Sequence, residues 1–246
     1  MLAIIGGSGL SKLSNLTVER REVVRTPFGE PSGALLFGRV CDQPAVFLAR
    51  HGYGHTVPPH KVNYRANIWA LKQAGAQCIV SVASVGGIRA DLVPGALVVP
   101  DQIIDYTWDR PNSFFDGGET PVVHVDFTHP YDQVLRQRLL AAAEAAGEAV
   151  FDGAVYAATQ GPRLETIAEI NRFERDGADI VGMTGMPEAV LARELELPYA
   201  ALAMVVNPAA GRGGSVQGIE MRAMASTTEA IIGRVHNVLQ HLCATC

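Results

Sequence analysis

The sequence GPRLET at residues 161–166, followed after a helical spacer by GADIVGMTGMPEAVLARE at residues 177–194, decides the fold of this chain. Ile180 and Val181 precede a glycine-rich turn, which predicts a short buried strand that ends there. A helix is expected to follow at once, because Pro187 suits the first helical position. In an α/β sheet such a junction lies at the carboxyl end of a strand, where ligands bind, although an ordinary strand-to-helix turn has the same pattern.

Strands and helices alternate along the rest of the chain. This alternation predicts an α/β fold with a mixed central β-sheet flanked by helices on both faces. With 246 residues and 48% hydrophobic content, the chain can bury a large core, and we expect a single domain over residues 1–246. The expected strands lie at residues 2–5, 34–37, 45–49, 79–85, 96–99, 155–158, 178–183 and 199–206, and the expected helices lie at 63–74, between 131 and 147, from 187 and from 219 onward.

One connection is longer than the others. The loop at residues 107–121 is rich in Asp, Gly, Pro and aromatic residues. Because so long a loop is uncommon in a compact domain, we expect it to act as a lid or as a subunit contact.

The charge balance argues against two classes of partner. The chain has 20 Lys and Arg against 25 Asp and Glu, a formal net charge of −5, which disfavours nucleic acid and anionic membranes. Residues 1–10 lack the basic start of a signal peptide, and no apolar run approaches the roughly 20 residues of a membrane span. We therefore expect a cytoplasmic protein.

Histidines and cysteines raise a metal alternative. His51, His55 and His60 are closely spaced, but the prolines between the last two keep a helix from aligning all three on one face. Cys243 and Cys246 form a C-x-x-C at the carboxyl terminus without a second pair, so an incidental spacing outweighs a metal or redox role. No metal is expected.

Polar and small residues follow the predicted strands at their carboxyl ends. If these ends meet, they form a pocket of the size of inorganic phosphate, because an arginine can bind a phosphate through two parallel hydrogen bonds and an imidazole can add a donor. One carboxylate and one amide then remain for a second ligand. The phosphate set is Ser8, Arg50, His51, Ser84 and Thr184, and the remaining pair is Glu165 and Asn207.

A dinucleotide site is an alternative at the first of these strand ends. The sequence GGSGL at residues 6–10 follows a short apolar strand, as in nicotinamide-binding folds. The third glycine of that fingerprint would fall at Lys12, and no acidic residue clearly ends a second strand further on. The pattern therefore disfavours a nicotinamide oxidoreductase.

Several long segments resemble one enzyme family. They are GGSGL at 6–10, RHGYGHTVPPHKVNYRANIWAL at 50–71, GGIRADLVPGALVVPDQIID at 86–105, GPRLET and GADIVGMTGMPEAVLARE. In this order they resemble the trimeric purine nucleoside phosphorylase and methylthioadenosine phosphorylase family, from the first strand to about Glu220. The portion HTVPPHKVNYRANIWAL is similar to the methylthioadenosine branch.

The resemblance implies phosphorolysis, in which phosphate attacks the anomeric carbon of a nucleoside and expels the purine. It implies a homotrimeric pentosyltransferase of purine salvage that uses phosphate as co-substrate and needs no metal or organic cofactor. His51, Glu165 and Asn207 would be the catalytic residues, and His124 would reach the site of a neighbouring subunit near the 5' substituent. The phosphate would contact Ser8, Arg50, His51, Ala83, Ser84 and Thr184, while Met183 would cover the ribose and Leu164, Glu165, Asn207, Pro208 and Ala209 would surround the base.

The base contacts depart from those expected in the methylthioadenosine branch, which has two aspartates after the late strand and a serine in the G-P-R segment. Here those positions hold Asn207, Ala209 and Glu165. A 6-oxopurine carries a proton on N1, which a carboxylate accepts, and an O6 to which an amide donates. Adenine has no proton on N1, so its lone pair would face the carboxylate. The base contacts therefore favour a 6-oxopurine.

The other end of the substrate is read from Ile219, which falls where the methylthio branch has a valine and the hydroxyl-recognising branch a histidine. An aliphatic side chain favours a thioether over a hydroxyl. Together the two ends predict 5'-methylthioinosine as the substrate. The alternatives are a methylthioadenosine phosphorylase, a general inosine and guanosine phosphorylase, and a regulatory protein that binds phosphate or nucleoside without turnover.

Overall fold

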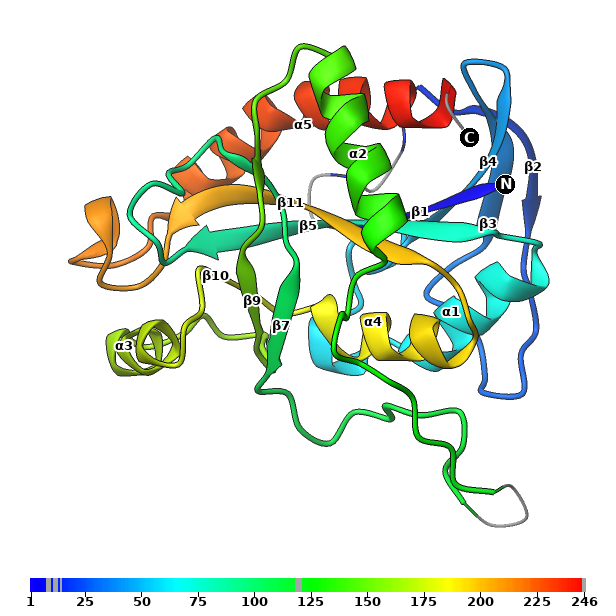
Figure 1. Ribbon diagram of the computed structural model, residues 1–246, viewed down its shortest axis with the longest axis horizontal. Helices are drawn as coiled ribbons and strands as arrows, with labels where there is room; N and C mark the ends of the chain where they lie inside the picture. Colours follow the sequence, from blue (N-terminus) through cyan, green and yellow to red (C-terminus); the bar gives the residue numbers. More distant parts are fainter. Residues whose placement is uncertain (8–9, 11–12, 14, 118–120, 245–246) are drawn as a thin grey trace.

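A computed structural model of the chain describes residues 1–7, 10, 13, 15–117 and 121–244. Within this part of the chain, a single sheet of eleven strands forms the centre of the molecule (Figure 1). The strands are β1 (Leu2–Gly6), β2 (Thr17–Glu22), β3 (Leu35–Val40), β4 (Gln43–Ala49), β5 (Cys78–Gly87), β6 (Leu97–Val99), β7 (Gln102–Asp105), β8 (Val150–Asp152), β9 (Val155–Ala158), β10 (Ile180–Gly182) and β11 (Tyr199–Pro208). The helices are η1 (Pro59–Lys61), α1 (Tyr64–Gln73), α2 (Gln133–Ala145), α3 (Ile167–Arg175), α4 (Gly185–Glu194), η2 (Gly213–Ser215) and α5 (Met221–Ala244).

The sheet is mixed and branches at its longest strands. Its main path runs β2-β3-β4-β1-β5-β10-β9-β7, while β11 pairs with β5 and leads through β6 to β8. Strands β4, β1, β5 and β11 run parallel to one another, whereas β10 pairs antiparallel with the end of β5. The parallel strands bring their carboxyl ends to one edge of the sheet, where the site described below is located.

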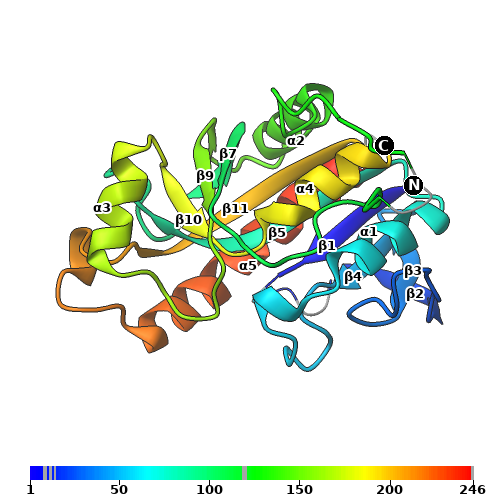
Figure 2. The same ribbon diagram turned by 90° about the horizontal axis from the view of Figure 1, so that it is seen from below.

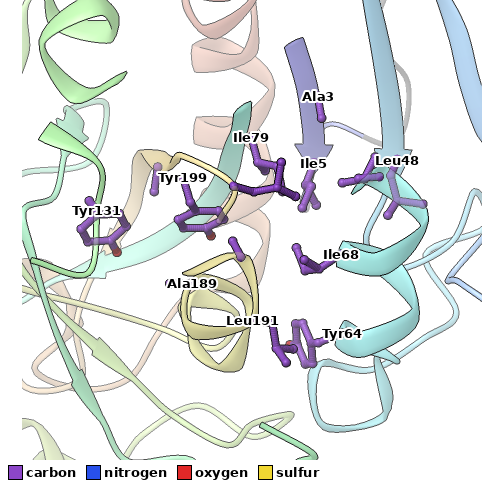
Figure 3. Packing of buried hydrophobic residues seen from close by; sticks show 14 of the residues in the cluster. Ala3, Ile5, Leu48, Tyr64, Ile68, Ile79, Tyr131, Ala189, Leu191 and Tyr199 are labelled. Atoms are coloured by element: carbon purple, nitrogen blue, oxygen red, sulfur yellow. The ribbon is translucent and has the colours of Figure 1, made fainter. Parts of the chain in front are cut away.

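Helices cover both faces of the sheet. Figures 1 and 2 show α2 and α5 on one face and α1 and α4 on the other. Strand β1 shows why two layers form, because its buried residues alternate: Leu2 and Ile4 pack in the cluster that includes α2 and α5, whereas Ala3 and Ile5 pack in the cluster that includes α1 and α4. In Figure 3, Ile68 of α1 and Leu191 of α4 lie on the same side of the sheet as Ile5. The predicted fold class, a mixed sheet between helices, is confirmed.

The expected strand at 155–158 has the observed bounds, and most other predicted elements are displaced by one to three residues at an end. Strands β2, β7 and β8 were not predicted. Strand β2 has the sequence TVERRE, in which every residue is exposed, and it lies at the end of the path with β3 as its neighbour. Because a charged edge strand has no apolar alternation, its sequence carries no strand signal.

The helices of this chain show no candidate for a membrane span: among the described residues, none has both the length and the apolar character that crossing a bilayer requires.

Gly182 lets the end of β10 lie against Tyr156, and this contact gives a test of the packing. A Cβ at Gly182 would lie 2.1 Å from the hydroxyl oxygen of the fully buried Tyr156. We expect Gly182→Ala to lower the free energy of unfolding by about 2 kcal/mol, because the ring has no room to retreat. Gly233→Ala in α5 is the matched control, since its Cβ would meet nothing within 4 Å and should raise stability by up to about 1 kcal/mol. Urea unfolding of both variants measures the difference, and equal midpoints would contradict this account of the β10 packing.

Candidate active site

A cavity of about 420 Å³ lies where the ends of β4, β5, β10 and β11 meet. It gathers most of the residues predicted from the sequence, although these come from six separate segments. A larger cavity of about 620 Å³ lies at the opposite edge of the sheet, beside Met1 and Gln77, and contains none of them. The predicted residues that line the smaller cavity are Arg50, His51, Ala83, Ser84, Leu164, Glu165, Met183, Thr184, Asn207, Ala209 and Ile219.

Three predicted residues are not among those that line it. Ser8 lies outside the described residues, although the preceding Gly7 does line the cavity. Pro208 lies between the lining residues Asn207 and Ala209. Its carbonyl accepts hydrogen bonds from the Asn207 side-chain amide and the Ser215 hydroxyl. His124 is exposed, away from the cavity of its own chain.

Arg50 enters the site from the end of β4 as a fully buried cation. Its Nε and Nη2 donate to the two carboxylate oxygens of Glu188 at 2.7 and 2.9 Å, and the hydroxyl of Tyr199 donates to the same carboxylate at 2.8 Å. Burial disfavours the charged guanidinium, but the ion pair with Glu188 outweighs it and leaves the pKa of Arg50 above its ordinary value.

This ion pair corrects one detail of the sequence prediction. Glu188 occupies Nε and one N–H of Nη2, and the other N–H of Nη2 donates to the Ser81 hydroxyl at 2.6 Å, so Arg50 has no pair of adjacent N–H groups left to hold a phosphate through two parallel bonds. The remaining nitrogen, Nη1, donates to the Val82 carbonyl at 3.1 Å and lies beside Gly7, where an added Cβ would come within 2.8 Å of it. Arg50 therefore faces the cavity through the edge of Nη1.

His51 follows Arg50 and is held in one orientation. Its Nδ1 lies 2.8 Å from the carbonyl oxygen of Val57, which can only accept, so Nδ1 carries the proton. Burial, and next the positive charge of Arg50, lower the pKa of His51 to about 4. The imidazole is thus neutral at neutral pH and its Nε2 is an acceptor, so the expected donor role toward phosphate requires a second proton on the ring.

Thr184 stands between the end of β10 and the first regular turn of α4. Met186 has φ −118° and ψ 141°, which interrupts the helix, so regular helix begins at Pro187 as the sequence predicts. The backbone amide of Thr184 donates to the hydroxyl of Tyr156 at 3.4 Å, and the Thr184 hydroxyl does not cap the helix. This strand-to-helix turn therefore presents Thr184 to the cavity rather than to the helix end.

Glu165 is presented by the turn between β9 and α3. The Thr159 hydroxyl donates to its Oε1 at 2.7 Å, and burial raises the pKa of its carboxyl. The next residue, Thr166, forms a capping box with Glu169: the Thr166 hydroxyl accepts from the Glu169 amide at 3.1 Å, and the Glu169 carboxylate accepts from the Thr166 amide at 2.7 Å. Both ends of the turn are fixed, so Glu165 meets the cavity in one arrangement.

Asn207 reaches the cavity because of an irregularity in β11. Val205 pairs with Val85 and Asn207 pairs with Gly86, so β11 has one more residue than β5 at this point. The Asn207 Nδ2 donates one hydrogen bond of 2.7 Å to the Pro208 carbonyl. Its second N–H and its Oδ1 have no partner among the described residues, which leaves the amide able to bind a ligand by both a donor and an acceptor.

One part of the cavity wall is apolar. It is formed by the loop that leads into η1 with the first residue of η1, and by the segment before α5 with the first turn of α5. Ile219, which was predicted to meet the 5' substituent, belongs to this part and is half-buried. The other apolar side chains there are Val57, Pro58, Pro59, Met221 and Met224.

Two buried charged residues beside the cavity, Glu188 and Arg110, were not assigned to the site from the sequence. Glu188 could have been found, because it lies among apolar residues in the first turns of α4. Arg110 gave no signal, because it lies in a polar loop, yet only 8% of its surface is exposed.

The histidines and cysteines that raise the metal alternative do not gather into one cluster among the described residues. His51 and His55 lie with ring centroids 4.8 Å apart, but within the described part of the chain no three His, Cys, Asp or Glu side chains form a group that could hold a metal ion. Cys78 and Cys243 are buried, and Cys246 lies outside the described residues.

Comparison with known proteins yields one family. The sequence profile of the Phosphorylase superfamily matches residues 1–240. A probable S-methyl-5'-thioinosine phosphorylase of Pseudomonas syringae pv. tomato is 56% identical over 214 residues, which are 87% of either chain. A 6-oxopurine nucleoside phosphorylase of Pyrococcus furiosus is 48% identical over 87% of this chain and 81% of its own. Methylthioadenosine phosphorylase from Schistosoma mansoni, solved in complex with adenine, superposes with a TM-score of 0.94 at 33% identity and covers 99% of this chain and 91% of its own.

The neutral His51 makes stability depend on pH in a defined window. Its pKa is about 4 in the folded chain against 6.5 in the unfolded chain. As the pH falls from about 6.5 to about 4, the unfolded state takes up the proton first, so stability is lost in that window and is unaffected by this group above it. Between pH 7.5 and pH 4.5, we expect the free energy of unfolding of His51→Gln to fall by about 1–2 kcal/mol less than that of the wild type. Urea unfolding at both values measures this, with His129→Gln at an exposed position as control; a wild-type slope in His51→Gln would show that His51 is not held neutral.

Proposed function

Because the chain belongs to the Phosphorylase superfamily, we propose that it splits S-methyl-5'-thioinosine with phosphate into hypoxanthine and 5-methylthioribose 1-phosphate. A phosphate oxygen forms a bond to the anomeric carbon of the sugar. The bond from that carbon to the purine nitrogen breaks, its electron pair leaves with the base, and the base takes up a proton. The observation that carries the proposal is that Glu165 and Asn207 share one cavity with Arg50 and Thr184.

The base is recognised by Glu165 and Asn207. With Oε1 held by Thr159, the carboxylate of Glu165 can accept the N1 proton of a 6-oxopurine through its other oxygen. The free N–H of Asn207 can donate to O6 or N7. Adenine would place an unprotonated N1 against the carboxylate, and leaving a buried charged group unpaired costs a few kcal/mol, roughly a hundredfold or more in preference.

Catalysis follows from the charges that develop. The departing purine becomes negative around N7 while the sugar becomes oxocarbenium-like, so the Asn207 N–H at the base and an anionic phosphate beneath the sugar both stabilise the transition state more than the ground state. The phosphate would be held by Nη1 of Arg50, Thr184 and the segment at Ala83 and Ser84, with Met183 over the ribose. The proposed reaction needs no metal or organic cofactor, and phosphate is its second substrate.

The 5' group is recognised by shape and polarity. The wall at Ile219, Met221 and Met224 offers aliphatic and thioether contacts, and these fit a methylthio group better than a hydroxyl that would lose its hydrogen bonds to water. The names of the relatives support the same combination, since one is a probable S-methyl-5'-thioinosine phosphorylase and another is a 6-oxopurine nucleoside phosphorylase. General inosine and guanosine phosphorolysis is the second candidate, favoured by the 48% identity to the Pyrococcus furiosus protein.

Assembly and location belong to the same proposal. A cytoplasmic homotrimer would bring His124 of one subunit to the 5' side of the site in the next. The exposed positions of His124 and of Val122, whose surface is 71% exposed, fit such a contact.

The base assignment is tested by kinetics on methylthioinosine, methylthioadenosine, inosine and guanosine. We expect methylthioinosine to have the highest kcat/KM, about a hundredfold above methylthioadenosine. Asn207→Asp should shift the ratio toward the 6-amino substrate, because a carboxyl can accept from the amino group. Faster turnover of methylthioadenosine by the wild type, or an unchanged ratio in Asn207→Asp, would reject the base assignment. Phosphate-dependent release of hypoxanthine also separates an enzyme from a protein that only binds nucleosides.

The 5' assignment is tested at Ile219. We expect Ile219→His to lower kcat/KM for methylthioinosine and to raise it for inosine, so that their ratio falls about tenfold or more, because the imidazole can bind the 5' hydroxyl. Ile219→Val is the matched control, since it keeps an aliphatic wall and should change the ratio little. Equal ratios in the two variants would place the 5' group elsewhere.

A further inference from the structure

Arg110 is a buried cation that the reaction above does not use. It lies in the segment between β7 and α2, and 8% of its surface is exposed. No carboxylate of the described residues pairs with it. Its five N–H groups lie within hydrogen-bond distance of six acceptor atoms instead, four of them backbone carbonyl oxygens. Burying a cation without a carboxylate is costly unless a dense set of acceptors surrounds it. Here the acceptors lie in segments that also carry residues of the cavity wall.

The first wall is the turn that presents the base-binding carboxylate. Nη2 of Arg110 donates to the carbonyl oxygens of Thr159 at 3.1 Å and Gln160 at 2.7 Å, and Nε donates to the Gln160 side chain at 3.2 Å. The Thr159 hydroxyl in turn donates to Glu165 at 2.7 Å. Arg110 thereby fixes the residue that orients Glu165.

The second wall is the turn from β10 into α4. Nη1 of Arg110 donates to the carbonyl oxygens of Met183 at 2.9 Å and Met186 at 2.6 Å, which flank Thr184. Met186 is the residue with non-helical dihedral angles directly before the regular part of α4, so Arg110 binds the point at which the turn becomes helix. Arg110 thereby fixes the turn that carries the sugar and phosphate contacts. Figure 2 shows that β9, β10 and the start of α4 lie side by side.

The third wall is the loop before α1. Nη1 of Arg110 lies 3.3 Å from the hydroxyl of Tyr64, which donates to the Pro59 carbonyl at 2.9 Å. Pro59 lines the apolar part of the cavity. All three walls are thus joined at one guanidinium group.

We propose that Arg110 is a positioning residue that holds the base-binding and phosphate-binding walls of the cavity in one fixed relation. The inference rests on the proposed function, because it assigns Glu165 to the base and Thr184 to phosphate. A guanidinium is required for this, since its five N–H groups lie in one plane and diverge toward separate acceptors, whereas a lysine ammonium is a single point. Reaction rate depends steeply on such placement, because a shift of about 1 Å can cost about a hundredfold.

The test compares Arg110→Lys with Arg136→Lys. Arg136 is the control: it is 4% exposed and donates to the carbonyls of Val99 and Pro100 and to the Asp152 carboxylate, and none of these residues lines the cavity. We expect Arg110→Lys to lower kcat/KM for methylthioinosine at least about tenfold and to raise the KM values for methylthioinosine and for phosphate. The preference for methylthioinosine over methylthioadenosine should also fall. Arg136→Lys should lower the melting temperature by a similar amount and leave the KM values and the preference unchanged.

A second variant keeps the inference testable if Arg110→Lys does not fold. Gln160→Met removes the side-chain acceptor of Nε and leaves the guanidinium in place. It should raise the KM values for methylthioinosine and for phosphate by about threefold. Unchanged KM values and preference in Gln160→Met or in folded Arg110→Lys, or equal kinetic changes in Arg136→Lys, would overturn the positioning role. Failure of the wild type to split any of the nucleosides would instead refute the proposed function.

Discussion

The buried ion pair between Arg50 and Glu188 is the interaction on which the rest of the site depends. Through this pair and its partners, the end of β4, the interior of β5 at Ser81, the start of β11 at Tyr199 and helix α4 converge on one group of polar atoms. Removing two charges from water is costly, and such a pair persists only when its hydrogen bonds are satisfied. Here they are, so the sheet and α4 are locked together at the site.

The same pair sets the electrostatic character of the cavity. Because Glu188 neutralises Arg50, and because His51 is uncharged at neutral pH, the floor of the cavity carries little net positive charge. An anion there would be held mainly by single N–H and O–H donors at strand ends, which bind oxyanions by geometry rather than by bulk charge. Such a site favours an anion that is to react, since it places the oxygen atoms without surrounding them with counter-charges.

Much of the fold and of the site could be predicted from the sequence, for identifiable reasons. Apolar runs in the sequence indicated β1, β5 and β11. Because parallel strands bring their carboxyl ends to one edge of the sheet, small or polar residues at those ends, such as Ser84 and Asn207, could be assigned to one candidate site. The partner of Arg50 and the contacts of Arg110 could not be predicted. Both depend on which carbonyl or carboxylate a long side chain meets after folding, and no periodic pattern records that. The position of the proton on His51 Nδ1 could not be predicted either, because it is fixed by the Val57 carbonyl, which His51 meets only in the folded chain.

The extra residue in β11 ahead of Asn207 has a consequence for how this family of sites can diverge. Along β11, Val205 packs with the α1 and α4 side and Val206 with the α2 and α5 side, so the insertion at this point decides which side chain turns toward the ligand. If Asn207 binds the base as proposed, loss of a single residue here would turn its amide away from the cavity although the surrounding motif stayed the same. The length of β11 at this point therefore helps to set which side chain can meet a bound base.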